Sequence, residues 1–178
     1  MAILLPSKGL TQFATSFFGS SGGVYADLDV LSCKPIDPLL IGQQCVLGLE
    51  PKEHAKKFSV QRIIGNAFRA AEASHGFFEL VTRRLKDFAA QRGDDASCIL
   101  KSTGPLMLTK LYDEFDDKTS VAIERSGVLF PLNADEAKVI RSSGIMNVDV
   151  AHAYTIHYFF GTWWSAERVP LGVLPGRS

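Results

Sequence analysis

The sequence is poor in cysteine and has no excess of charge of either sign. Its three cysteines, Cys33, Cys45 and Cys98, are widely spaced and form no C-x-x-C pair, which excludes a zinc ribbon and a disulfide scaffold. We expect them to be small buried hydrophobic residues, unless a secretory lumen allows one disulfide. The 19 basic and 19 acidic residues cancel, so we do not expect the basic surface of a nucleic-acid-binding protein.

Long apolar runs are also lacking. No stretch approaches the roughly 18 apolar residues that mark a membrane-spanning helix. The apolar patch at residues 2–5 has no basic residue before it, so it does not read as a signal peptide. No repeat or linker divides the 178 residues, a length typical of one domain with a real hydrophobic core. We therefore expect a single domain over residues 1–178.

Hydrophobic patterns predict alternating helices and strands, and hence an α/β domain. Strands are expected at 24–31, 45–49, 97–100, 121–123 and 128–132, and helices at 10–18, 66–91 and from Pro105 onward. Glycine is expected to end the first two helices, at Gly19 and Gly93. Surface positions are expected for His54 and His75, and solvated carboxylates for Asp94-Asp95 and Asp116-Asp117.

The sequence feature with the clearest chemistry is a pair of aspartates, Asp27 and Asp29, after two glycines. On a strand both carboxylates would project from one face, with Ala26, Leu28 and Val30 turned into the core. Two carboxylates this close repel one another unless a cation lies beside them, and oxygen ligands favour magnesium or manganese. A D-x-D pair by itself is weak evidence, because most such pairs are solvated surface carboxylates.

Four segments in order carry a more specific pattern. They are Gly22-Gly23-Val24-Tyr25-Ala26-Asp27-Leu28-Asp29 with Lys34-Pro35-Ile36-Asp37, then Ile64-Gly65-Asn66-Ala67, then Thr103-Gly104-Pro105 with Leu108-Thr109, and finally His157 with Thr162-Trp163. Together they resemble glycosyltransferases with a DxD sugar-binding region (residues 22–37 here). That family includes inositolphosphoceramide mannosyltransferases, initiating Golgi mannosyltransferases and α-1,4-galactosyl- or N-acetylglucosaminyltransferases.

The resemblance implies a GT-A-like nucleotide-diphospho-sugar transferase domain that retains anomeric configuration. It also implies a divalent ion, manganese before magnesium. The sugar transferred from the nucleotide-sugar donor would be of the mannose, galactose or N-acetylglucosamine type, and the acceptor would be a glycan or glycolipid. A Golgi or secretory-lumen location follows from the same likeness, with membrane association only through a segment absent from this chain.

The resemblance also assigns roles to individual residues. Asp29 and His157 would ligate the metal, and Asp27 would contact the donor ribose or sugar or share in the metal shell. Gly22, Gly23 and Tyr25 would lie against the donor, and the indole of Trp163 would donate to the leaving diphosphate. Asn66 and Gly104 would lie near the transferred sugar or the acceptor. No covalent nucleophile is expected.

Each of these residues also has an ordinary structural explanation. His157 lies among aromatic residues and fits a core histidine, while Trp163 and Trp164 fit as cover for the core. Asn66 fits a helix N-cap, and the Thr103–Pro105 segment fits a plain helix start.

The chain departs from the family at its front. Only 21 residues precede Gly22, where the family has its first nucleotide-binding strand and an acidic-then-arginine helix. We therefore expect a GT-A-like sheet lacking its N-terminal strand or strands, with an exposed edge and a tendency to associate.

Two other functions compete with the transferase. A non-catalytic remnant of the family would keep the carboxylates and bind metal or sugar without turnover. A haloacid-dehalogenase-type phosphatase also uses D-x-D with magnesium, but it wants apolar residues before the first aspartate and Thr or Val two places after the second. Here Gly22 and Gly23 precede the pair and Leu31 stands at that last place, so the hydroxyl is absent.

Overall fold

The computed structural model describes residues 19–89, 96–144 and 148–161. Within them a four-stranded sheet has the order β1-β4-β3-β5, and a two-stranded sheet pairs β2 with β6. The strands are β1 (Gly23–Ala26), β2 (Val30–Ser32), β3 (Cys45–Leu49), β4 (Ile64–Ala71), β5 (Val121–Glu124) and β6 (Thr155–His157). The helices are α2 (Asp37–Leu40), α3 (Lys52–Lys57), α4 (Gly76–Ala89), α5 (Ala96–Ser102), α6 (Pro105–Glu114), α7 (Ser126–Leu129) and α8 (Ala134–Ser143), with a 3-10 turn at Lys118–Ser120.

The larger sheet is mixed. β4 runs antiparallel to both β1 and β3, whereas β3 and β5 are parallel. The α/β class expected from the sequence is therefore confirmed. Among the described helices, none combines the length and apolar character needed to cross a bilayer.

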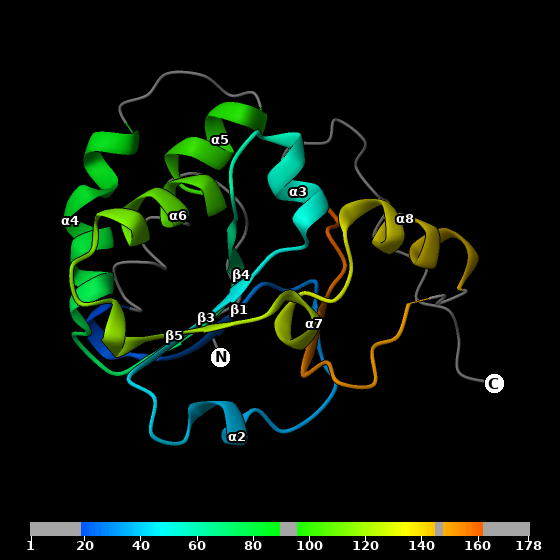
Figure 1. Ribbon diagram of the computed structural model, residues 1–178, viewed down its shortest axis with the longest axis horizontal. Coiled ribbons are helices and arrows are strands. Elements are labelled where there is room, and N and C mark those ends of the chain that lie inside the picture. The colour runs from blue at the N-terminus through cyan, green and yellow to red at the C-terminus, as the bar shows by residue number, and fades with distance from the viewer. Residues whose placement is uncertain (1–18, 90–95, 145–147, 162–178) are drawn as a thin grey trace.

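Helices α4, α5 and α6 cover one face of this sheet (Figure 1). On α4, which lies within the helix expected at 66–91, Phe77, Val81, Leu85 and Phe88 form an apolar stripe and are all buried. They pack with residues of β3, β4 and α6 in one cluster of the hydrophobic core. This layer fixes β4, the central strand that contacts the turn after β1.

The opposite face is built around Phe130, which follows α7 and is fully buried. Its ring lies over Gly48 of β3 and Gly65 of β4, which are partners in the sheet register. A Cβ on Gly65 would come within 2.6 Å of that ring, and one on Gly48 within 2.9 Å. The two glycines therefore make room for Phe130.

Several elements differ from the sequence expectations. The strand predicted at 24–31 is two short strands, β1 and β2, separated by a turn at 27–29. Residues 66–71 of the helix predicted at 66–91 belong to strand β4, and the helix begins only at Gly76. Apolar runs do not separate a buried strand from a buried helix, and the Ala-rich sequence of β4 misled the prediction.

Two predicted strands are not strands. Residues 97–100 belong to α5, and the segment 128–132 consists of the end of α7 and the loop after it, whereas β3 and β5 lie where strands were expected. Pro105 opens α6 as predicted. Near the N-terminus, residues 19–21 are helical, so Gly19 does not end a helix as predicted. Residues 10–18 lie outside the described part of the chain. So do Gly93 and Asp94-Asp95.

The surface positions expected for the two histidines are wrong. His75 is buried, and its Nδ1 accepts from the N–H of Phe77 at 3.3 Å. His54 is largely buried between Glu50, at 2.7 Å from Nδ1, and the N–H of Ala134, at 3.0 Å from Nε2. Hydrogen-bond partners made burial of both rings possible, and the Ala134 partner of His54 lies 80 residues away, where no local sequence pattern could indicate it.

The cysteine expectation holds in part. Cys45 is buried as expected, whereas Cys98 is half-buried and Cys33 exposed, and the three form no disulfide. Asp116 and Asp117 are exposed, as predicted.

Replacing Gly65 with alanine tests the close approach of Phe130. We expect Gly65→Ala to lower the free energy of unfolding by about 1–3 kcal/mol, because the new methyl group overpacks the ring. Gly127→Ala in α7 is the matched control, since a Cβ there meets nothing within 4 Å. Urea unfolding of both variants measures the difference, and equal stabilities would contradict this account of the core.

Candidate functional site

The turn between β1 and β2 carries both aspartates. Its conformation is fixed by two backbone bonds, Asp27 N–H to the Ala67 carbonyl at 2.8 Å and Val30 N–H to the Asp27 carbonyl at 3.1 Å. The inward orientation predicted for Ala26 and Leu28 is wrong, because Ala26 is exposed and Leu28 is 77% exposed. Asp27 and Asp29 are half-buried, as is Val30, which packs against the core. The turn breaks the strand alternation after Ala26, and so it directs the carboxylates inward and the leucine outward.

Asp29 is held by the C-terminal end of the described chain. Its Oδ1 lies 3.3 Å from Nε2 of His157, and its Oδ2 accepts the N–H of Phe160 at 2.8 Å. The N–H of Tyr158 donates to its backbone carbonyl at 2.9 Å. Burial alone would raise the pKa of Asp29, but the bond and charge of His157 together with the Phe160 N–H outweigh it and hold that pKa below its ordinary value.

Asp27 has a different environment. The hydroxyl of Tyr25 donates to its Oδ1 at 2.7 Å. Burial raises the pKa of the Asp27 carboxyl against the lowering effect of that hydrogen bond. Burial, followed by the charge of Asp27, also raises the pKa of Tyr25. The two aspartates of one turn therefore have pKa values shifted in opposite directions.

A buried arginine supports Tyr25. Arg69 is the register partner of Tyr25 across β1 and β4, and its guanidinium carbon lies 4.1 Å from the centroid of the tyrosine ring. Burial lowers the pKa of Arg69, while Tyr25 and Asp27 act against that shift. Sequence reasoning missed this residue, although an arginine inside the apolar run of β4 was a signal for it.

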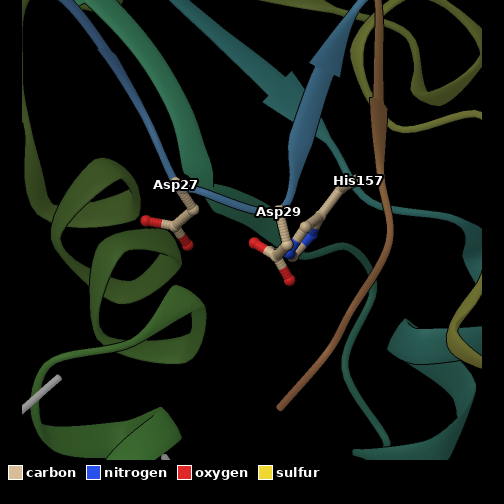
Figure 2. Close-up of side chains that lie close together, drawn as sticks. All are labelled: Asp27, Asp29 and His157. Atoms are coloured by element: carbon tan, nitrogen blue, oxygen red, sulfur yellow. Dashed lines mark ion pairs between the residues drawn. The ribbon is translucent and has the colours of Figure 1, made fainter. Parts of the chain in front are cut away.

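The aspartates and His157 form one cluster. Their candidate ligand atoms all lie within 4.8 Å of one another. Figure 2 shows both carboxylates on the same side of the turn, with the imidazole reaching them from β6. Two carboxylates and an imidazole offer the oxygen and nitrogen ligands that manganese, magnesium and similar divalent ions take in proteins.

The ring of His157 is packed between aromatic side chains. Its centroid lies 3.9 Å from that of Phe159 and 6.2 Å from that of Phe130. Phe159 has a φ of 50°, in the left-handed region that phenylalanine rarely adopts. In the described part of the chain, the buried Nδ1 of His157 has no hydrogen-bond partner. The core-histidine explanation therefore covers the packing of this ring but leaves one polar atom unexplained.

The two glycines before the aspartates differ in their surroundings. Gly22 has a φ of 64°, and a Cβ there would meet the Ala73 nitrogen at 2.4 Å. Gly23 has a φ of 102°, and a Cβ there would meet nothing within 4 Å. The positive φ values favour glycine at both positions. The backbone of Ala73 crowds Gly22, whereas Gly23 leaves open space beside β1.

The remaining predicted site residues do not belong to the aspartate–histidine cluster. Asn66 lies in β4 beside Ala67, whose carbonyl accepts from Asp27, so its interpretation as a helix N-cap is wrong. Gly104 is buried at the start of α6, where a Cβ would come within 2.8 Å of the Leu100 backbone. Close packing of α5 therefore accounts for Gly104. Trp163 and Trp164 lie outside the described residues.

No family model, curated protein or solved structure matches the chain. The function is therefore argued from the geometry around the β1–β2 turn.

The opposite pKa shifts of the two aspartates predict opposite effects on stability without metal. Ionised Asp29 stabilises the fold above its ordinary pKa of 3.8, and that stability is lost as the pH falls through its lower folded-state value. Ionised Asp27 opposes folding as the pH rises above 3.8 toward its raised folded-state value.

At about pH 7 in chelator, we expect Asp29→Asn to lower the free energy of unfolding by about 1–3 kcal/mol, the usual worth of a hydrogen-bonded charge. Asp27→Asn should raise it, because the amide resembles the protonated carboxyl. Urea unfolding measures both, and both differences should shrink in acid. A larger loss for Asp27→Asn than for Asp29→Asn would contradict the assignment.

Proposed function

We propose that the protein is a metal-dependent retaining glycosyltransferase with a GT-A-like domain. The observation that carries the proposal is the meeting of Asp27, Asp29 and His157, the three residues for which the family resemblance implies metal ligation. Asp29 and the segment after His157 are joined directly, by a hydrogen bond spanning 131 residues. The mixed α/β fold is compatible with such a domain.

The residues fit a divalent cation. The cluster combines carboxylates with an imidazole whose Nδ1 is buried and, within the described chain, unpartnered. A cation would relieve the repulsion between the aspartates and the burial cost that raises the pKa of Asp27. Manganese, the ion favoured by the resemblance, would neutralise charge on the departing diphosphate.

The chain's own side chains have distinct tasks in this proposal. Asp29 is kept ionised by His157 and the Phe160 N–H, so it presents a negative charge at neutral pH. The Tyr25 hydroxyl holds one oxygen of Asp27 and thereby orients the other toward the donor or the cation. The open space beside Gly23 allows a nucleotide-sugar to approach the backbone closely.

The acceptor would approach from the β4 side. Asn66 lies on the strand that contacts the Asp27 turn, and we assign it to the transferred sugar or the acceptor. A glycan or glycolipid acceptor and a Golgi or secretory-lumen location belong to the same proposal. The indole of Trp163 would complete the donor site from outside the described residues.

The direct experiment incubates the protein with manganese and a panel of UDP- and GDP-sugars and follows nucleotide release. We expect metal-dependent hydrolysis or transfer with at least one donor. Asp29→Ala should lower both manganese affinity and turnover at least about tenfold, which is the low end of the cost of disturbing a metal shell. Asp116→Ala, an exposed aspartate outside the cluster, is the matched control and should change neither.

Two other outcomes would overturn the proposal. Manganese binding without release from any donor would favour the non-catalytic remnant. Hydrolysis of a generic aryl phosphate, lost in Asp27→Asn, would identify the phosphatase instead.

A further inference from the structure

A groove of about 820 Å³ lies between the segment after α3 and helices α5 and α6. It lies outside the aspartate–histidine cluster and contains none of its residues. Four cations border it, Lys57, Arg62, Lys101 and Lys110, against the single carboxylate of Asp113. The whole chain is electrically neutral, so this groove concentrates positive charge.

The single carboxylate of the groove already has a cationic partner. Asp113 forms an ion pair with Arg62, whose guanidinium also lies 5.6 Å from the centroid of the Tyr112 ring. Within the described residues, Lys57, Lys101 and Lys110 form no ion pair, and all three are exposed. The Lys110 ammonium lies 5.4 Å from the centroid of the Phe88 ring, a contact that does not neutralise its charge. The three lysines are therefore available to an anion from solution.

The wall of the groove is fixed before any ligand arrives. Thr109 of α6 donates to the Pro105 carbonyl at 2.7 Å and accepts the N–H of Ile64 at 2.8 Å. These bonds anchor α6 on β4 from a buried position. Leu106 and Val60 add apolar surface to the lining. A preformed groove keeps the cost of ordering low when a ligand binds.

Strand β4 connects the groove to the aspartates. Its Ile64 is bonded to Thr109 in the groove, and its Ala67 is bonded to Asp27. Three residues of strand span about 10 Å. Strand β4 therefore runs from the wall of the groove to the turn that carries the aspartates.

We propose that this groove binds a phosphate ester of a sugar or polyol, the acceptor of the transfer, through Lys57, Lys101 and Lys110. This inference rests on the proposed function. The phosphate matches the unpaired ammonium charges, and the hydroxyl groups of the same molecule supply what a glycosyl acceptor needs. Nucleic acid is disfavoured, because the chain as a whole is neutral and the groove has only four cations.

The test is a calorimetric titration with glucose 6-phosphate and mannose 6-phosphate in chelator, with glucose and mannose as uncharged probes. Chelation keeps metal-bridged phosphate binding at the aspartates out of the measurement. We expect the phosphates to bind, the uncharged sugars not to bind, and the affinity to fall as salt rises. The Lys101→Gln/Lys110→Gln double variant should bind at least about tenfold more weakly, a loss of 1.4 kcal/mol.

The control is Lys138→Gln, which removes the same charge from the exposed face of α8 and should leave the affinity unchanged. Lys110→Arg, which keeps the charge, should also bind normally. An equal loss in Lys138→Gln, or no binding of either phosphate to the unaltered protein, would overturn the inference. Binding only to vesicles containing phosphatidate would overturn it too, since the groove would then take a lipid surface.

Asp29→Ala separates this inference from the proposed function. That variant should lose manganese binding and still bind glucose 6-phosphate. Groove binding without any donor turnover would leave an anion site but contradict the acceptor role. Donor turnover without groove binding would sustain the transferase and overturn the groove.

Discussion

The pairing of β2 with β6 is the constraint on which the candidate site depends. It sets Val30 opposite His157, which brings the imidazole beside Asp29. The chain after β6 then donates two backbone N–H groups to the same aspartate, from Tyr158 to its carbonyl and from Phe160 to its carboxylate. Loss of this short sheet would separate His157 from the carboxylates and leave Asp29 without the partners that lower its pKa.

The other half of the site is stabilised less well. Asp27, Tyr25 and the buried guanidinium of Arg69 form a stacked and hydrogen-bonded chain on β1 and β4. Burial penalises the charged forms of both Asp27 and Arg69, and neutral replacements of similar shape often stabilise such groups. Burial therefore makes the ionised form of Asp27 costly to the stability of the fold, as expected where a carboxylate has a binding task.

The class of the fold and the residues of the cluster could be predicted from the sequence. The local geometry of the β1–β2 turn and the contacts across the sheet could not. The helical stripe of α4 and the strands β3 and β5 follow from periodicity, and the motif order placed His157 with the aspartates. Leu28 was predicted on the wrong face, because a turn replaces the expected strand at this point. That turn depends on a hydrogen bond to the Ala67 carbonyl of β4, a residue distant in the sequence. The role of Arg69 was not predicted, because its partner Tyr25 lies on a neighbouring strand and is brought next to it only by the pairing of β1 with β4.

The central claim is that the β1–β2 turn and β6 together form one divalent-cation site. Paramagnetic line broadening in nuclear magnetic resonance spectra during a manganese titration tests it most directly. We expect substoichiometric manganese to broaden the ring signals of His157 and the backbone amide of Phe160 first, well before the ring of His75. Unaffected His157 signals, or earlier broadening at His75 or His152, would contradict it.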